Sequence, residues 1–187
     1  LMLPVNTLVG QRSVDFRDVS WGMSKAEVRQ AESGSLQGEN STSLVYKDSI
    51  ANIEMIVGYT FSQDSEELIA AGYLSDEKYQ DQNRYVEDYR TLKSHLTEQY
   101  GEPIKDKIQW LNNFFKSSPK KYGFAVSLGH VYYLSEWEND DTVITMTLVG
   151  NDYTIEHLVS FKSKAHQDKL DFIKEQAAEI YQRKYFQ

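Results

Sequence analysis

Residues 130–161 predict three consecutive β-strands and read HVYYLSEWENDDTVITMTLVGNDYTIEHLVSF. Apolar and polar side chains alternate within three segments, which is the pattern of strands that bury one face. Asn, Asp and Gly residues lie between the segments and favour tight reversals of the chain. Strands joined by such short turns must be antiparallel, so we expect a meander over residues 130–138, 142–149 and 153–161.

More strands are expected upstream of this meander. Alternating apolar residues predict a strand at 53–61, which an acidic turn joins to a second strand at 68–74 as an antiparallel hairpin. Residues 44–46 predict a brief strand, and residues 104–110 return to strand alternation. Residues 33–43 are rich in Ser, Gly and Asn, so they are expected to form a loop.

A helix with a complete start signal is predicted after Trp21. The Ser24 hydroxyl is placed to accept from the Glu27 amide, and the Glu27 carboxylate to accept from the Ser24 amide, which together make a capping box. Met23 and Val28 stand at the positions of a hydrophobic staple. Gly34 is the expected left-handed stop of this short helix.

Two longer helices are predicted from apolar stripes of helical period. The first covers residues 82–100 and carries Tyr85, Tyr89, Leu92, Leu96 and Tyr100. The second covers residues 163–185 and carries Leu170, Ile173, Ala177, Ile180 and Lys184. Between them, Pro119 favours a short helix that ends before Gly129, while a single strand through 122–134 is the alternative.

The expected fold is α+β, with antiparallel β-meander strands in one or more sheets and helices packed on one face. The chain is treated as one domain over residues 1–187. The order helix, short strand, meander occurs twice, which predicts two related halves at 14–76 and 77–162, followed by a C-terminal helix at 163–186.

Composition excludes several classes of protein. The 187 residues are 40% hydrophobic and 26% charged, which is typical of a folded domain and not of a disordered chain. A net charge of −8 argues against nucleic acid as a partner, since its phosphates require clustered Lys and Arg. The absence of cysteine excludes disulfides, thiol catalysis and cysteine-ligated metals. No segment has the length and apolarity of a membrane span.

No catalytic or cofactor motif is recognised. The chain lacks a nucleophile elbow, a phosphate-binding loop and a dinucleotide fingerprint, so we expect no cofactor. The four histidines, His95, His130, His157 and His166, lack metal-ligand spacing, so no metal site is expected. The favoured function is therefore non-catalytic binding of a protein partner. The alternatives are a carboxylate hydrolase assisted by His130 or His157, and a domain that binds a small apolar molecule between sheet and helices.

Five residues are candidates for a binding site. Trp137, with Tyr133 close in sequence, is a candidate for an exposed aromatic patch that binds a partner or a glycan, although core packing explains it better. Glu138, Asp140 and Asp141 offer oxygen ligands that could hold Ca²⁺ loosely. They lack the spacing of an EF-hand loop, so a solvated turn is the favoured interpretation.

Residues 16–28, FRDVSWGMSKAEV, resemble the opening of uncharacterised exported bacterial domains, and residues 89–103 are similar to a later segment of the same domains. A Gly-Met-Ser helix start before an antiparallel meander also resembles the β-lactamase-inhibitor-protein-like fold, which the small lipoprotein of the outer-membrane assembly machine shares. The resemblance implies a periplasmic or secreted binding or scaffolding domain. Residues 1–10 are then either the tail of an export signal or an edge strand. Without cysteine, the lipid anchor of that lipoprotein does not carry over.

Overall fold

The computed structural model describes residues 14–171 of the 187-residue chain. Two predicted features lie outside the described residues: the segment 1–10, and the part of the final helix that carries Ile173, Ala177, Ile180 and Lys184. The described start of that helix is η2 (Lys164–His166), which helical residues 167–171 follow. Leu170, the first residue of the predicted apolar stripe, is buried there.

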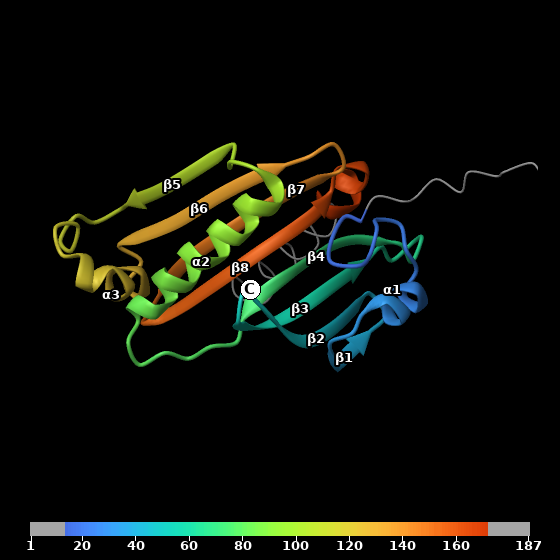
Figure 1. The fold of residues 1–187 in the computed structure, drawn as a ribbon, viewed down its shortest axis with the longest axis horizontal. Helices are drawn as coiled ribbons and strands as arrows, with labels where there is room; N and C mark the ends of the chain where they lie inside the picture. The colour runs from blue at the N-terminus through green and yellow to red at the C-terminus, as the bar shows by residue number, and fades with distance from the viewer. Residues whose placement is uncertain (1–13, 172–187) are drawn as a thin grey trace, which may run out of the picture.

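One antiparallel sheet dominates residues 14–171, and its strand order is β1-β2-β3-β4-β8-β7-β6-β5 (Figure 1). The strands are β1 (Ser35–Asn40), β2 (Ser43–Ile50), β3 (Ile53–Phe61), β4 (Leu68–Ser75), β5 (Lys105–Trp110), β6 (Val131–Glu138), β7 (Thr142–Asn151) and β8 (Thr154–Ser163). The predicted meander and hairpin are thereby confirmed, since β6, β7 and β8 pair in turn and β3 pairs with β4.

The sheet consists of two four-stranded meanders that meet where β4 pairs with β8. The first meander follows α1 (Lys25–Ala31), and the second follows α2 (Asn83–Tyr100). The order of one helix and four strands therefore occurs twice along the chain. Only the second meander contains an insertion, α3 (Tyr122–Ser127), between its first two strands. That the halves 14–76 and 77–162 are related stays a prediction.

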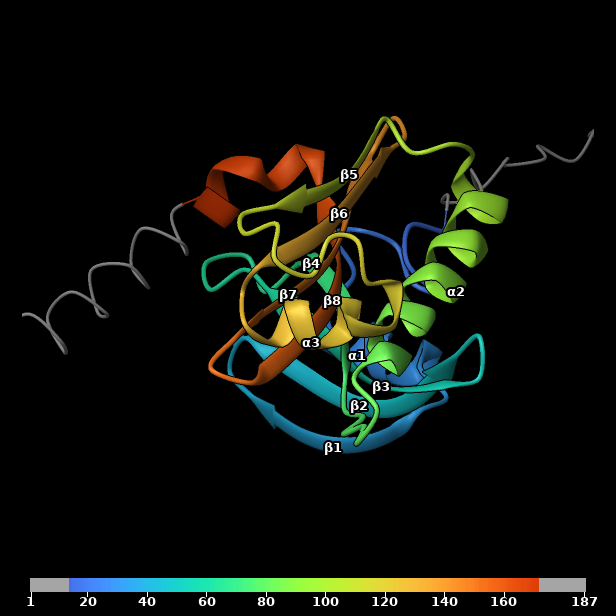
Figure 2. The same cartoon turned by 90° about the vertical axis from the view of Figure 1, so that its left-hand side faces the viewer.

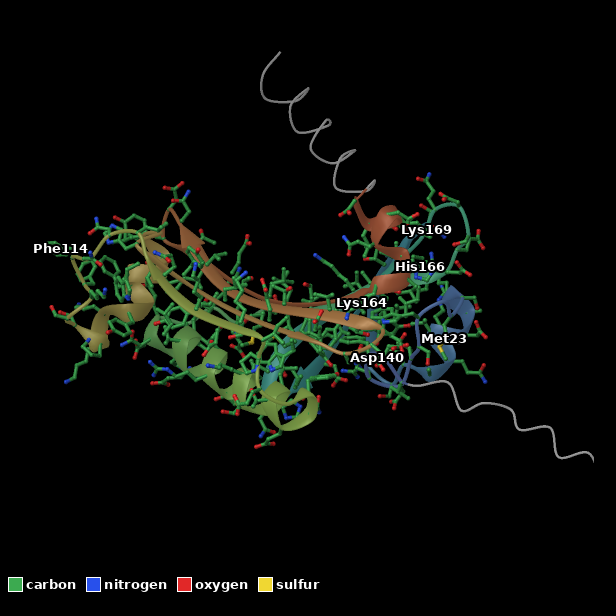
Figure 3. The ribbon with its side chains drawn as sticks, turned by 90° about the horizontal axis from the view of Figure 1, so that it is seen from above. Met23, Phe114, Asp140, Lys164, His166 and Lys169 are labelled. Carbon is green, nitrogen blue, oxygen red and sulfur yellow. The ribbon has the colours of Figure 1, made fainter. Side chains whose placement is uncertain are left out.

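The helices α2 and α3 lie against one face of the sheet, below it in Figure 3. The apolar stripe of α2 packs there, with Tyr85, Val86, Tyr89, Leu92 and Leu96 buried. Along β3 and β7, buried side chains alternate with partly or fully exposed ones. This is the pattern of a sheet with one face packed against the core. The largest of the fully buried side chains are Trp137, Tyr59, Tyr133, Phe16, Phe61 and Phe161. An α+β fold is thus confirmed, with α2 and α3 on one face of its antiparallel sheet and the helical residues 164–171 on the other side of it (Figure 3).

The start of α1 is confirmed, but its predicted end is wrong. Ser24 accepts from the amide of Glu27, and Glu27 accepts in return from the amide of Ser24. The helix ends at Ala31, and Gly34 does not adopt a left-handed conformation. Glu32 leaves the helix in an extended conformation because its carboxylate turns inward, where it accepts from the amide of Gly34 at 2.7 Å.

Two local predictions in the first meander are also wrong. Residues 35–40 form β1 and not a loop, since their backbone pairs with β2 across a bulge between Leu36 and Gly38. The brief strand expected at 44–46 is the centre of the eight-residue β2. β1 is polar and mostly exposed because it is an edge strand, so its sequence lacks the alternation that marks a buried strand.

The choice between helix and strand after Pro119 is settled in favour of the helix. Pro119 opens η1 (Pro119–Lys121), α3 follows, and Gly129 comes next with a positive φ of 69°. Figure 2 shows α3 beside the first turns of α2. Gly123 makes this contact possible, because a Cβ atom there would lie 2.1 Å from the Gln82 carbonyl oxygen.

Among residues 14–171, no helix combines the length and the apolarity needed to cross a membrane.

Candidate functional site

The sheet face that is turned away from α2 carries a row of aliphatic side chains across its strands. The pairing register places seven residues side by side, one from each of seven neighbouring strands: Lys47, Ile56, Leu74, Leu158, Thr147, Leu134 and Lys107. Leu74 and Leu158 are each 42% exposed although β4 and β8 lie at the centre of the sheet. Adjacent exposed leucines in this position mark a contact surface more often than isolated ones do. We call Ile56, Leu74 and Leu158 the aliphatic ridge.

A row of small residues runs beside the aliphatic ridge. Gly58 pairs with Gly72, and Gly72 pairs with Ser160, on three adjacent strands. A Cβ atom at Gly58 would meet nothing within 4 Å, so the missing side chain leaves open space above the sheet. The result is a hollow of about 300 Å³ whose lining, within residues 14–171, comes from β3, β4 and β8. We call this hollow the open-face groove.

The described residues that line the open-face groove carry no charge, and two ion pairs lie farther out on the sheet. Lys47 lies 3.0 Å from the Glu54 carboxylate, and Lys105 lies 2.9 Å from that of Glu136. Exposed pairs of this kind add little stability, but they remove net charge from the surface. The open-face groove is therefore an apolar, uncharged hollow on an acidic protein.

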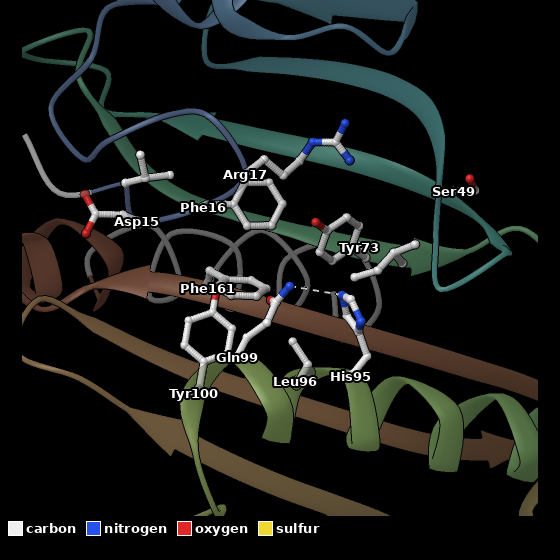
Figure 4. Close-up of a pocket in the computed structure, with 12 residues that line it drawn as sticks. Asp15, Phe16, Arg17, Ser49, Tyr73, His95, Leu96, Gln99, Tyr100 and Phe161 are labelled. Atoms are coloured by element: carbon white, nitrogen blue, oxygen red, sulfur yellow. Dashed lines mark hydrogen bonds between the residues drawn. The ribbon is translucent and has the colours of Figure 1, made fainter.

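A second concavity lies on the opposite side of the sheet, between the chain before α1 and the second half of α2 (Figure 4). Its volume is about 250 Å³. Phe16, Tyr73 and Phe161 form one wall, with ring centroids 4.7 to 6.1 Å apart. On the α2 side, the Gln99 amide and the His95 imidazole hydrogen-bond to each other at 3.1 Å.

The charged groups of this cleft already have partners inside the protein. Arg17 donates to Glu32 at 2.9 Å and forms a short ion pair with Asp48. The Asp15 carboxylate accepts from the amide of Trp21 at 2.9 Å, and burial raises the pKa of that carboxyl. Arg17 thereby ties the segment before α1 to β2, and Asp15 bonds within that segment, so both charges have a structural role.

Trp137 and Tyr133, two of the five candidate residues, lie on the helix-covered face. Trp137 is 1% exposed, and its indole N–H donates to the Gly101 carbonyl at 3.0 Å. Tyr133 is 2% exposed, and burial raises the pKa of its hydroxyl. Both side chains pack in the core, as the alternative interpretation of Trp137 expected, so they form no exposed aromatic patch in this structure.

The three acidic candidates lie at the turn between β6 and β7. Glu138, Asp140 and Asp141 are exposed, and Lys164 lies 3.2 Å from the Glu138 carboxylate. The side-chain oxygen of Asn139 organises the turn by accepting from the amide of Thr142 at 2.7 Å. Within the described part of the chain, no three His or acidic side chains converge as metal ligands. The turn chemistry of Asn139 explains this segment without a bound ion.

His130 and His157 do not form the arrangement that the hydrolase alternative requires. His157 is 1% exposed on β8, and neither of its ring nitrogens has a hydrogen-bond partner among the described residues. His130 stacks on Phe115 at 5.9 Å. In residues 14–171, neither imidazole bonds to a carboxylate, so neither is paired for general acid–base work.

Sequence reasoning missed the residues of the open-face groove. The available signal was a glycine inside each of two predicted neighbouring strands, Gly58 and Gly72, since interior strand glycines mark bulges or close approaches. That they lie side by side follows only from the register of β3 and β4.

Comparison with known proteins found no matching family model, no matching curated protein and no matching solved structure. Fold and site define an α+β protein whose antiparallel sheet, over residues 14–171, carries α2 and α3 on one face and the open-face groove on the other.

Proposed function

We propose that this chain is a non-catalytic protein-interaction domain that binds an amphipathic helix of a protein partner in the open-face groove. One observation carries the proposal: an apolar hollow beside the aliphatic ridge, at the centre of the sheet, which the described residues of β3, β4 and β8 line. Apolar grooves that accept the apolar stripe of a helix are a recurring mode of peptide recognition.

The spacing of side chains supports a helix as the occupant. The aliphatic ridge and the row that contains Thr60 and Ala70 are four residues apart along the strands. At about 3.4 Å per residue the two rows are roughly 14 Å apart, which accommodates a helix about 10–12 Å in diameter. Such a helix crosses the strands, with its apolar side chains over Gly58 and Gly72.

Charge favours a different protein over a second copy of this chain. None of the described residues that line the open-face groove is charged, whereas the chain carries −8. Two copies brought together by these faces would join two acidic molecules, and their repulsion opposes that contact. A partner helix with an apolar stripe and no strong charge meets no such penalty.

The test uses a displayed library of helical peptides with randomised apolar faces, selected against the full chain. We expect enriched peptides to bind at least tenfold more weakly to Gly58→Val, because the valine fills the open-face groove. Gly38→Val is the matched control, since its Cβ also meets nothing within 4 Å but lies on β1. Equal affinity for all three proteins, or no enriched peptide, would contradict the proposal.

The same variant separates the other possible occupants. If no part of this chain occupies the open-face groove, we expect Gly58→Val to leave the melting temperature unchanged or to raise it. The reason is that valine favours strands more than glycine does. A fall of several degrees would show that residues of this chain fill the open-face groove. Dimers that dissociate in Gly58→Val, measured by sedimentation, would assign the groove to a second copy. Either result overturns the proposal.

We also propose that the domain acts outside the cytoplasm, in the periplasm or after secretion. The resemblance of residues 16–28 to exported bacterial domains supports this location. Fractionation of cells that express the natural gene tests it, with recovery among cytoplasmic markers as the contradicting result.

A further inference from the structure

The segment 111–121 combines exposed apolar side chains with unopposed positive charge at one end of the molecule. It reads LNNFFKSSPKK and contains three lysines and no acidic residue. Leu111 is 69% exposed and Phe114 is 77% exposed, the latter the highest value among the large hydrophobic residues of the described chain. Figure 3 places Phe114 at the far end of the molecule from Met23 and Lys169. We call this segment the basic tip.

The exposed side chains of the basic tip are presented by an ordered backbone. Leu111 donates its amide to the His130 carbonyl at 2.8 Å, and Phe114 donates its amide to the Asn112 side chain at 3.0 Å. The Tyr122 hydroxyl donates to the carbonyl of Lys116 at 2.9 Å. The backbone is therefore anchored to His130, directly before β6, and to the start of α3, and little conformational entropy is lost when the tip binds.

The two phenylalanines that follow each other in the basic tip differ in exposure, since Phe115 is partly buried and Phe114 is exposed. Phe115 packs its ring on Phe124 at 5.5 Å and on His130 at 5.9 Å. Phe114 touches this cluster only through Phe115, at 4.8 Å, and otherwise projects outward. Tyr153, 68% exposed, lies 6.3 Å from Phe124 at the same end. Aromatic residues in this setting are typical of membrane–water interfaces.

The charge distribution makes the basic tip distinct from the rest of the protein. The whole chain carries −8, so subtracting the three positive charges of Lys116, Lys120 and Lys121 leaves −11 for all other residues. The molecule is thus a dipole that an anionic surface orients with the basic tip towards it. Each lysine near an anionic bilayer contributes favourably to binding, and apolar side chains that enter the interface add to it.

We propose that the basic tip binds the surface of an anionic phospholipid bilayer, with Phe114 and Leu111 inserted at the headgroup level and the three lysines among the headgroups. A bilayer is favoured over an acidic protein because the apolar side chains stand on a projecting loop. A fluid interface accepts such a loop without a complementary pocket, whereas a protein partner would have to supply one. This inference does not depend on the open-face groove, which β3, β4 and β8 form.

The experiment is co-sedimentation of the full chain with vesicles of phosphatidylcholine alone and of phosphatidylcholine mixed with phosphatidylglycerol. We expect binding only to the anionic vesicles, and weaker binding as salt is raised. The double variant Leu111→Ser/Phe114→Ser is expected to bind about tenfold more weakly because apolar insertion is lost. Lys116→Gln/Lys120→Gln/Lys121→Gln is expected to lose the preference for anionic lipid.

The matched control is Leu36→Ser, which removes an exposed leucine (49%) from β1 and is expected to bind as the unmodified chain does. Circular dichroism of each variant verifies that it is folded. Three results would overturn the proposal: no binding to either vesicle, equal binding to both, or unchanged binding by Leu111→Ser/Phe114→Ser. Binding to beads that carry polyglutamate, without binding to anionic vesicles, would assign the basic tip to an acidic protein and also overturn it.

Discussion

His157 is a buried base without a hydrogen-bond partner among the described residues. It faces α2 from β8, and its ring lies 5.5 Å from that of Tyr89. Burial in this apolar setting lowers the pKa of the imidazole to about 4. In the unfolded chain the pKa of a histidine is about 6.5. At a pH between these two pKa values, His157 is therefore protonated in the unfolded state and neutral in the native state.

This difference predicts that stability falls as the pH drops from 7 towards 4, because protons favour the unfolded state in that range. The contribution of His157 is about 2–3 kcal/mol at pH 4.5. Urea unfolding of the chain and of His157→Phe at pH 7.5 and pH 4.5 measures it. The phenylalanine variant is expected to lose less stability on acidification by that amount. An equal loss in both proteins would contradict the prediction.

Glu32 is a buried carboxylate held by three donors, the Arg17 guanidinium, the Gly34 amide and the Tyr59 hydroxyl. Its side chain is 1% exposed, and Arg17 reaches it from a backbone conformation with a φ of 52°, which non-glycine residues seldom adopt. The Glu32 carboxylate is shielded from water, so the loss of the Arg17 guanidinium would leave a buried charge without a counterion. Such an unpaired buried charge strongly destabilises the folded state.

We expect Arg17→Met to destabilise the protein by about 3–5 kcal/mol, because it leaves the Glu32 carboxylate buried without a cation. Asp48→Asn is the matched control. It removes the other carboxylate that Arg17 contacts, but the Asp48 side chain is 33% exposed, so the expected cost is below about 1 kcal/mol. Chemical denaturation of both variants gives the comparison. Similar losses of unfolding free energy in the two variants would show that the Arg17–Glu32 pair contributes no more stability than the Arg17–Asp48 pair.

At the scale of elements, α3 is held by backbone contacts that only glycine permits. Gly123 touches the start of α2, and its amide donates to the Asn83 side chain at 2.8 Å. On the other side of α3, a Cβ atom at Gly150 would lie 2.4 Å from the Val126 carbonyl oxygen. α3 is therefore clamped between α2 and the end of β7.

Gly123→Ala tests this clamp. Alanine favours a helix over glycine by about 1 kcal/mol, so propensity alone predicts a more stable protein. We expect instead a loss of at least about 1–3 kcal/mol, since α2 and α3 must move apart to accommodate the methyl group. Ser94→Ala, at an exposed position of α2, is the control and is expected to change stability by less than about 0.5 kcal/mol. Thermal melts provide the measurement, and a rise in melting temperature for Gly123→Ala would contradict the packing argument.

Helices and strands whose sequence pattern lies within one short segment were predictable. Elements that depend on contacts with distant segments were not. The capping box of α1, the stripe of α2 and the alternation in β3 each lie within one short segment. β1 was missed because an edge strand covers no core and needs no apolar alternation. The end of α1 was misplaced because the inward turn of Glu32 depends on Arg17 and Tyr59, which are distant in sequence.

At the scale of the whole molecule, two surfaces are arranged so that they do not compete. Within the described part of the chain, the open-face groove lies at the centre of the sheet face opposite α2 and α3, whereas the basic tip projects from the end where β5 and α3 meet. A partner helix in the groove and a bilayer at the tip can therefore be tested independently, with Gly58→Val affecting the first and Leu111→Ser/Phe114→Ser the second.

The sequence by itself determined the α+β class, most elements and the absence of cysteine chemistry, because helical and strand periods and composition are local or additive properties. The tertiary structure decided which groups meet. It buried Trp137 and Tyr133, isolated His130 and His157 from acids, and aligned Gly58 with Gly72. These outcomes depend on strand register and on the choice of covered face, and both arise from contacts between segments far apart in the chain.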